Sequence, residues 1–420
     1  MAMELLRSEE LPIQESLSAF PVVLLTGARQ VGKTTLVQRI ARGAWGARYV
    51  TLDDPVTREA ALRDPDGFLA STPPPLVLDE VQGVPDLLRA VKLRVDRMRD
   101  PGQYLLTGSA NLLAMRQVEE SLAGRVAIHE LLPLSLAERL QRPGVATRLD
   151  DLFAAPSAAR LLASLGAVRH ADDHALNLRP VMLSGGYPTP ALTSSARIRS
   201  RWFASYVQSY VERDLPAIAG IQFLGSFQRL LALLLLRSGN LLNVMDLSRT
   251  LGLSAATVQR YVDLLRLTYQ VSLLPPLAAN PEKRLVKTPK VYGGDTGLLA
   301  AMTGAVTWDD LMREGRAGAL FETWVHGELT KLLALSTATT NLSFWRKQTG
   351  PEVDFILRRG QTHIAIEAKT SAAGLGPALR NFHTLEQEQG LHLGIVVHLG
   401  DEAIALSDRV AAVPAHWLFA

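Results

Sequence analysis

Short apolar runs separated by helical stretches make up the first part of this chain. Val22 to Leu25 is an apolar run that predicts a buried parallel strand ending at Gly27, and a helical pattern begins at Lys33. Further strands are predicted at Tyr49–Leu52, Leu76–Glu80 and Gln103–Asn111, with helical stretches between them. Strands that alternate with helices in this way predict an α/β fold built on a parallel sheet.

The middle of the chain has helical patterns. Residues 141–180 are rich in Ala, Leu and Arg and predict helices. A helix predicted from Arg199 to Glu212 carries four aromatic residues spaced three and four apart, and such a stripe is typical of a core or a domain interface. These residues are Trp202, Phe203, Tyr206 and Tyr210.

A helix-turn-helix pattern follows from Asn243. One short helix is predicted to end at Gly252, and Ser254 is suited to cap a second helix. The strand-like segment 270–274 predicts a wing, so the pattern as a whole indicates a winged helix. Thr257, Gln259 and Arg260 would point outward from the second helix, where either DNA or another protein could bind. A basic run adds phosphate-seeking charge nearby, at Lys283, Arg284, Lys287 and Lys290.

The composition of the chain limits the kinds of site and partner that the protein can have. The formal net charge is only +3, so affinity for nucleic acid must come from local patches. The absence of cysteine excludes disulfides, thiolate metal sites and cysteine nucleophiles. The longest apolar run, Leu230 to Leu236, is far too short to span a bilayer, and the first residues lack the apolar core of a signal peptide. We expect a soluble cytoplasmic protein with no membrane partner.

The segment between the first strand and its helix has the pattern G-x-x-x-x-G-K-T, a P-loop. Its glycines let backbone N–H groups surround a phosphate chain at a helix N-terminus. Lys33 would reach the β- and γ-phosphates of ATP, and the Thr34 hydroxyl would ligate Mg²⁺. The predicted nucleotide-binding residues are Gly27, Ala28, Arg29, Gln30, Val31, Gly32, Lys33, Thr34 and Thr35.

Two acidic residues end the third predicted strand, at the edge where open α/β sheets bind ligands. Asp79 would join Thr34 in holding Mg²⁺, and Glu80 would polarise the attacking water. The next strand ends in small polar residues that could sense the γ-phosphate. Thr107, Ser109 and Asn111 are the candidates, and Ser109 or Asn111 is favoured.

Arg125 follows a glycine at the end of a predicted helix. It could act as an arginine finger on the nucleotide of a neighbouring subunit, which would make the protein a homo-oligomer, a ring or partial ring. It could equally be a surface arginine at a helix C-terminus.

The C-terminal part contains a pattern of acids on a predicted hairpin. Glu367 and Lys369 share one face of a strand, and Asp354 on the preceding strand can meet Glu367 across the pair. With the Ala368 carbonyl these carboxylates would form an oxygen site for Mg²⁺, to which Glu322 on an upstream helix could add a ligand. Lys369 would orient the attacking water or stabilise phosphate charge.

Several of these motifs carry a family resemblance. TGARQVGKTTL, YVTLDDP, LVLDEVQGVPDLL, LLTGSAN and SLAGRVAIHELLPLS resemble the AAA-type ATPase domain that precedes a domain of unknown function, of the DUF4143 type, in many prokaryotic proteins. SGGYP, YVERDLPAI, KTPKVYGGDTGLL and LFETWVHGEL resemble that downstream domain. Asp354, Glu367 and Lys369, with the upstream Glu322, resemble the PD-(D/E)xK nuclease fold, although Val353 replaces its proline. The resemblance implies AAA-type nucleotide chemistry joined to a winged helix and a nuclease-like terminus.

Together these patterns predict four parts. They are an AAA-type P-loop ATPase core (1–140), a helical lid (141–225), a winged helix (226–285) and a small α/β nuclease-like domain (286–420). The function expected is ATP binding and hydrolysis coupled to action on nucleic acid, with DNA as the partner and a Mg²⁺-dependent nuclease-like domain. The alternative is an ATP-switched assembly whose C-terminal domain docks DNA or protein without cleaving it.

Overall fold

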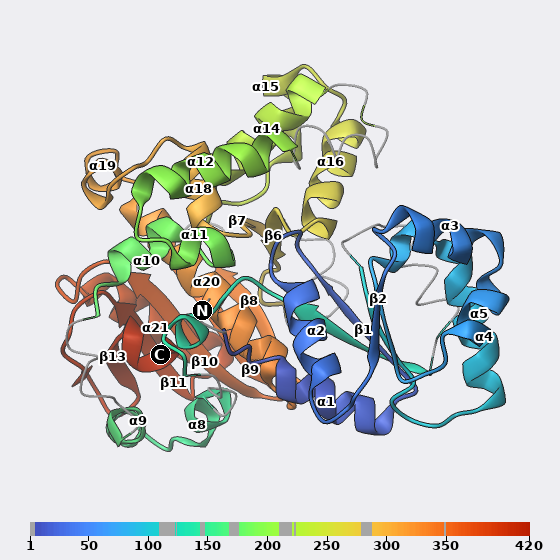
Figure 1. Cartoon of the computed structure of the whole chain (residues 1–420). Helices are drawn as coiled ribbons and strands as arrows, with labels where there is room; N and C mark the ends of the chain where they lie inside the picture. Colours follow the sequence, from blue (N-terminus) through green and yellow to red (C-terminus); the bar gives the residue numbers. More distant parts are fainter. Residues whose placement is uncertain are drawn as a thin grey trace. The chain divides into compact units, whose positions relative to one another are not determined.

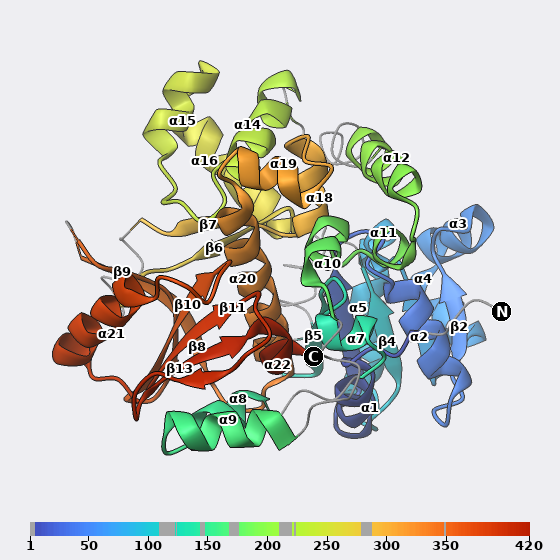
Figure 2. The same cartoon turned by 90° about the vertical axis from the view of Figure 1, so that its left-hand side faces the viewer.

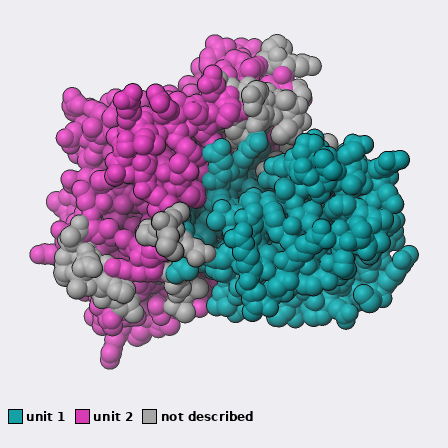
Figure 3. All heavy atoms as spheres, in the orientation of Figure 1, with its two compact units in different colours: residues 1–134, 267–269 teal, residues 135–266, 270–420 magenta. Residues whose placement is uncertain are grey.

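The computed structural model contains two compact units, coloured separately in Figure 3. The first comprises residues 1–134 and 267–269, and the second comprises residues 135–266 and 270–420. The structure describes residues 5–108, 122, 124–142, 148–167, 176–209, 221, 224–278, 288–347 and 350–420. The finer division into four domains stays a prediction.

The first unit is built on a five-stranded sheet in the order β2-β3-β4-β1-β5. Every neighbouring pair in this sheet is parallel, which confirms the α/β class and the parallel sheet. The carboxyl ends of the strands therefore meet at one edge. The strands are β1 (Val22–Gly27), β2 (Arg48–Thr51), β3 (Leu76–Asp79), β4 (Tyr104–Thr107) and β5 (Val126–Leu131).

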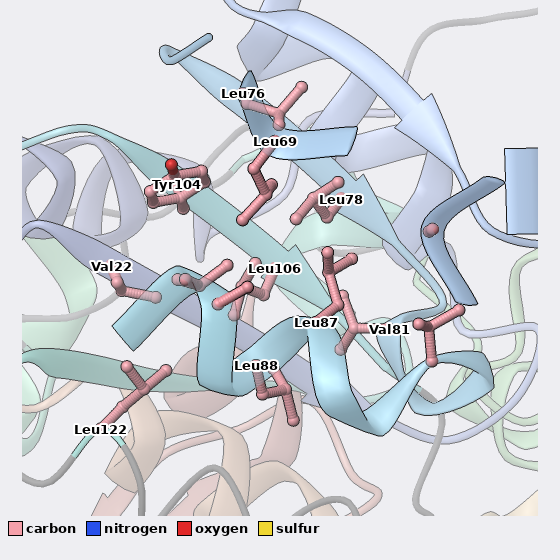
Figure 4. Close-up of a cluster of buried hydrophobic side chains, with 14 of the residues drawn as sticks. Val22, Leu69, Leu76, Leu78, Val81, Leu87, Leu88, Tyr104, Leu106 and Leu122 are labelled. Carbon is pink, nitrogen blue, oxygen red and sulfur yellow. The ribbon is translucent and has the colours of Figure 1, made fainter. Parts of the chain in front are cut away.

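Helices cover this sheet because its central strands are apolar on both faces. In Figure 4, Leu87 and Leu88 of α5 pack against Leu78 of β3 and Leu106 of β4. Asp54 and Asp64 each cap a helix that has proline at its first position, which is why the chain turns sharply twice after β2. The helices are α1 (Glu10–Ala19), α2 (Lys33–Arg42), α3 (Pro55–Arg63), α4 (Pro65–Ser71) and α5 (Pro85–Arg97), with a 3₁₀ turn at Val81–Gly83.

Helices dominate the second unit up to residue 313 (Figure 1). The predicted aromatic stripe packs internally: Phe203 and Tyr206 are buried, and the rings of Trp202 and Tyr206 are stacked 5.2 Å apart. Tyr210 lies outside the described residues. The helices are α7 (Leu136–Arg139), α8 (Arg148–Ala154), α9 (Ala158–Ala167), α10 (Leu178–Ser184), α11 (Pro188–Leu192), α12 (Ala196–Tyr206), α14 (Leu224–Leu236), α18 (Thr296–Met302) and α19 (Trp308–Arg313).

The predicted helix-turn-helix is present as α15 (Val244–Leu251) and α16 (Ala255–Leu267). Gly252 ends α15 with a φ of +67°, and the Ser254 hydroxyl accepts a hydrogen bond from the Thr257 N–H at 3.1 Å. After α16, β6 (Val271–Leu274) pairs antiparallel with β7 (Lys290–Gly293). Gln259 and Arg260 are exposed on α16.

The C-terminal half holds a mixed sheet in the order β12-β13-β11-β10-β9-β8 (Figure 2). Phe382 and Leu385 of α21 pack in one core with Ile356 of β9 and Ala365 of β10. The strands are β8 (Asn341–Arg346), β9 (Glu352–Arg359), β10 (Thr362–Lys369), β11 (Leu393–His398), β12 (Ile404–Ala405) and β13 (Val410–Pro414). The helices are α20 (Ala317–Leu335), α21 (Gly376–Gln389) and α22 (Ala415–Phe419). Among all the described helices, none combines the length and apolarity that a membrane crossing requires.

Candidate functional site

The P-loop joins the end of β1 to the start of α2, as predicted. Gly27 has a φ of +144° and Gly32 a φ of +103°, conformations that glycine adopts without strain. A Cβ atom at Gly27 would lie 2.3 Å from the carbonyl oxygen of Leu131, the last residue of β5. This glycine is therefore required by the pairing of β1 with β5 as well as by the shape of the loop.

Lys33 lies inside the loop that precedes it. Its ammonium donates to the carbonyl oxygens of Gly27 and Ala28, each at 3.0 Å, and the residue is buried. Burial lowers the pKa of Lys33, while the charges of Glu80 and Asp79 oppose that shift. The lysine is thus positioned where phosphate oxygens could replace two carbonyl partners.

The other residues predicted to bind nucleotide line the same turn. Ala28 and Val31 are buried, whereas Arg29, Gln30 and Thr35 are exposed. The Val31 carbonyl accepts a hydrogen bond of 2.8 Å from the Arg7 guanidinium, which also donates to the Leu132 carbonyl at 2.6 Å. Arg7 therefore links the P-loop to the segment that follows β5 and stabilises the loop.

The buried carboxylate of Asp79 accepts three hydroxyl hydrogen bonds at the carboxyl end of β3. Thr34 donates at 2.9 Å and Tyr49 at 2.6 Å, and Thr107 is the third donor. Burial, followed by the bond to Asp79, raises the pKa of Tyr49 to about 12. The structure brings the predicted magnesium ligands Thr34 and Asp79 together, and these hard oxygen atoms suit Mg²⁺.

Glu80 follows Asp79 in the left-handed backbone region, with φ 60° and ψ 47°. Such a conformation is uncommon for a residue with a side chain and recurs at functional sites. The Glu80 N–H donates to the Thr107 hydroxyl at 3.1 Å, and the Gln82 side-chain amide donates to the Glu80 carboxylate. Thr107 thus contacts both acids, whereas the favoured sensor residues Ser109 and Asn111 lie outside the described residues.

Arg125 lies at the opposite end of the sheet from the P-loop. It directly precedes β5, whose first residue pairs with Val22 at the start of β1, and it forms an ion pair with Asp96. With Arg99, Pro21 and Gly124 it lines a cavity of about 400 Å³. Its predicted role as an arginine finger stays a prediction.

Sequence reasoning missed Tyr49, Gln82 and Arg7. The short spacing from Glu80 is a usable signal for Gln82, whereas the contact of Tyr49 with Asp79 depends on β2 lying beside β3. No pattern near Arg7 indicates its contact with Val31.

In the second unit, the predicted acids on the hairpin are brought together. The Ala368 N–H donates to Asp354 at 3.0 Å. Glu367 accepts hydrogen bonds from Lys369 at 2.8 Å and from Asn381 at 3.1 Å. Burial and then the negative charge of Asp354 raise the pKa of Glu367 to about 7.

Glu322, the further predicted ligand, is held by a lysine and a tyrosine. The Lys290 ammonium lies 3.0 Å from Glu322 and 3.7 Å from Asp354, and the Tyr292 hydroxyl donates to Glu322 at 2.6 Å. Lys290 also pairs with Glu352 at 2.6 Å. Assigning Lys290 to a phosphate-seeking basic run was wrong, because the residue is only 2% exposed. Lys283, Arg284 and Lys287, the rest of that run, lie outside the described residues.

No group of three or more His, Cys, Asp and Glu side chains suited to hold a metal ion occurs among the described residues. A magnesium site at Asp354 and Glu367 would therefore depend on the Ala368 carbonyl and water. It stays a prediction.

Three segments of the chain match the profiles of known domain families. The profile of an AAA domain matches residues 19–140. A domain of unknown function (DUF8612) matches residues 176–309, and a domain of unknown function (DUF4143) matches residues 317–418.

Two curated proteins are similar over nearly the whole chain. They are the Uncharacterized protein Rv2008c of Mycobacterium tuberculosis and the Uncharacterized protein Mb2031c of Mycobacterium bovis. Each is 31% identical over 404 residues, which is 96% of this chain and 82% of the relative.

Solved structures give more distant similarity. A Walker-type ATPase of Pyrococcus abyssi is 12% identical with a TM-score of 0.39, covering 70% of this chain and 94% of that chain. A RuvB protein of Thermotoga maritima is 20% identical with a TM-score of 0.30, covering 63% of this chain and 88% of that chain.

Lys33→Ala should abolish ATP binding, because it removes the ammonium from the loop. Glu80→Gln should bind ATP but hydrolyse it at least ~100-fold more slowly, as expected for loss of a general base. Calorimetric titration and phosphate release measure the two effects, with Arg42→Ala at the exposed end of α2 as the control. Equal hydrolysis by Glu80→Gln and wild type would remove Glu80 from this role.

Proposed function

This chain belongs to the same family as the two mycobacterial proteins, and we propose that it is an ATPase, through the segment that matches an AAA domain, and that it acts on DNA. The observation that carries the ATPase part is the grouping of Lys33, Thr34 and Asp79 at one edge of the sheet. We also propose that it works in the cytoplasm, where ATP and DNA are both at hand.

The residues around the P-loop divide the chemistry between them. Lys33 binds the β- and γ-phosphates, and Thr34 with Asp79 holds Mg²⁺, which when bound neutralises phosphate charge. Gln82 orients the Glu80 carboxylate through a hydrogen bond. Glu80 accepts a proton from the attacking water while the water oxygen forms a bond to the γ-phosphorus and the bond from that phosphorus to ADP breaks. Thr107 contacts both acids and so fixes their relative positions.

The position of Arg125 supports a shared site between subunits. It lies at the opposite end of the sheet from the P-loop of its own chain, where it lines a cavity of about 400 Å³ with Arg99. Two guanidinium groups there would meet the triphosphate of a neighbouring subunit in a head-to-tail assembly. This arrangement makes the protein a homo-oligomer in its active form.

Arg125→Ala should lower ATP turnover by roughly 10³-fold, in line with loss of an arginine finger. Mixed in equal amounts with wild type, it should reduce turnover per wild-type subunit to about half, because every second neighbour then lacks the arginine. Arg97→Ala, an exposed arginine nearby that does not line the cavity, is the control. Turnover that does not depend on protein concentration, in a strictly monomeric protein, would contradict a shared site.

Helix α16 supports the DNA part of the proposal. It follows α15 through a glycine-containing turn and precedes the β6–β7 pair, the order expected of a winged helix. Gln259 and Arg260 are exposed on it, and the Arg260 guanidinium lies over the Tyr261 ring, 5.5 Å from its centroid. A guanidinium held in this way is positioned to contact a phosphate or a base edge.

Arg260→Ala should weaken binding to duplex DNA and reduce the slope of log affinity against log salt by about 1, as for loss of one phosphate contact. Fluorescence anisotropy at several salt concentrations measures both. Arg313→Ala, an exposed arginine on α19, is the control and should leave the slope unchanged. Unchanged affinity in Arg260→Ala would show that α15 and α16 do not bind DNA and would favour a protein-contact role.

The acidic cluster of the second unit supports two roles. The juxtaposed Asp354 and Glu367, with Lys369 beside them, favour Mg²⁺-dependent cleavage. The ion pairs of Lys290 with three carboxylates favour a docking module that binds without cutting, since they neutralise the cluster without a metal. We take docking as the first candidate and cleavage as the second.

A cleavage assay separates the two roles. Docking predicts that plasmid DNA stays intact with wild type in Mg²⁺, with and without ATP, while DNA is still bound. Nicking by wild type that disappears in both Asp354→Ala and Lys369→Ala would establish the second candidate instead. Arg358→Ala, on β9 beyond the cluster, controls for a contaminating nuclease.

A further inference from the structure

Lys290 is an ammonium enclosed by carboxylates from two elements. Its Nζ atom lies 3.0 Å from Glu322 on α20, and 2.6 Å and 3.7 Å from Glu352 and Asp354 on β9. Its side chain is 3% exposed, so water contributes little to its solvation. The three carboxylates are what allow a full positive charge to be buried here.

The backbone of β7 aims this lysine at the cluster. Lys290 pairs with Leu274 of β6 and forms a further bridge with Leu241, so its position along the strand is fixed from both sides. Tyr292, two residues on and therefore on the same face, donates its hydroxyl to Glu322 at 2.6 Å. The strand thus supplies a cation and a donor to the same carboxylate.

Three carboxylates lie around this one ammonium, so its charge opposes their mutual repulsion. Burial alone would lower the pKa of Lys290, but Glu322, Asp354 and Glu352 together raise it well above its usual value. Burial and the charge of Asp354 raise the pKa of Glu322 to about 7, even with the lysine in place. These carboxylates are therefore held together by the ammonium.

A divalent ion would compete with Lys290 for the same oxygen atoms. Mg²⁺ needs oxygen ligands at about 2.0 to 2.1 Å, so the carboxylates, whose oxygen atoms lie 2.6 to 3.7 Å from the ammonium, would have to move closer around an ion that replaced it. We propose that Lys290 is the resident cation of this cluster, and that the cluster becomes a divalent-cation site only when the lysine side chain is removed. This proposal rests on the docking role above, but its test measures metal binding rather than DNA, so either can fail alone.

The test uses the full chain with Lys290→Met, which keeps the side-chain length and removes the charge. In EDTA its melting temperature should fall by about 5 °C or more, because one buried and two partly buried carboxylates lose their partner. Added MnCl₂ should restore the melting temperature in a saturable way, and KCl at equal ionic strength should not. Electron paramagnetic resonance of Mn²⁺ should show one more bound ion than in wild type.

Two controls isolate the site. Lys290→Met/Glu322→Gln should lose most of the recovery by Mn²⁺, since one ligand is gone. Lys331→Met removes another partly buried lysine of the same unit, which pairs with Glu328 at 2.7 Å, and should gain no metal response. Any Mn²⁺ bound near Asp79 should be bound by all these variants alike, so it does not affect the difference in bound Mn²⁺ or in melting temperature between them.

Two outcomes would overturn the proposal. One is Lys290→Met that shows no metal-dependent recovery. The other is wild type that binds Mn²⁺ in a way that Glu322→Gln abolishes. The second outcome needs no Lys290 variant, so it decides the matter even if Lys290→Met is insoluble.

Discussion

The buried carboxylate of Asp79 is the constraint on which the nucleotide unit depends. A charge in that position is tolerated only if hydrogen-bond donors surround it. The three donors come from α2, β2 and β4, so one carboxylate fixes the P-loop helix and both neighbours of β3 at the same edge. Thr107 then extends the network to the Glu80 backbone, which places the second acid as well. The site therefore forms only if β2 and β4 lie on either side of β3.

The sequence was most informative where chemistry is local. The P-loop lies within nine consecutive residues, and Asp79 and Glu80 directly follow an apolar strand, so the sheet edge and its acids could be predicted together. Tyr49 could not be predicted as a partner of Asp79, because that contact depends on β2 lying beside β3. Thr107 was considered but not favoured, since its double contact requires β4 to be the other neighbour.

The second unit also contains a contact that could not be predicted from the sequence, because it depends on the tertiary fold. Asp354 and Glu367 lie on two strands of one hairpin, so their proximity follows from the alternation of side chains along β9 and β10. Lys290 lies on a different strand in a different sheet, and the sequence pattern placed it in a basic run with phosphate-seeking charge. Only the tertiary fold shows that it is buried against Glu322, and this contact changes the expected chemistry of the cluster.

Substitutions at Gly27 and at Lys33 would have different genetic effects. A side chain there would strike the Leu131 carbonyl, so a substitution would disturb the pairing of β1 with β5 before any ligand is involved. An allele with a bulky residue at position 27 would therefore behave as loss of the protein, lowering its abundance in the cell. If the subunits assemble as proposed, an allele that removes Lys33 would leave an inactive subunit that could still join normal copies and interfere with them. Two lesions in one short motif would thus differ in dominance, the first recessive and the second dominant negative.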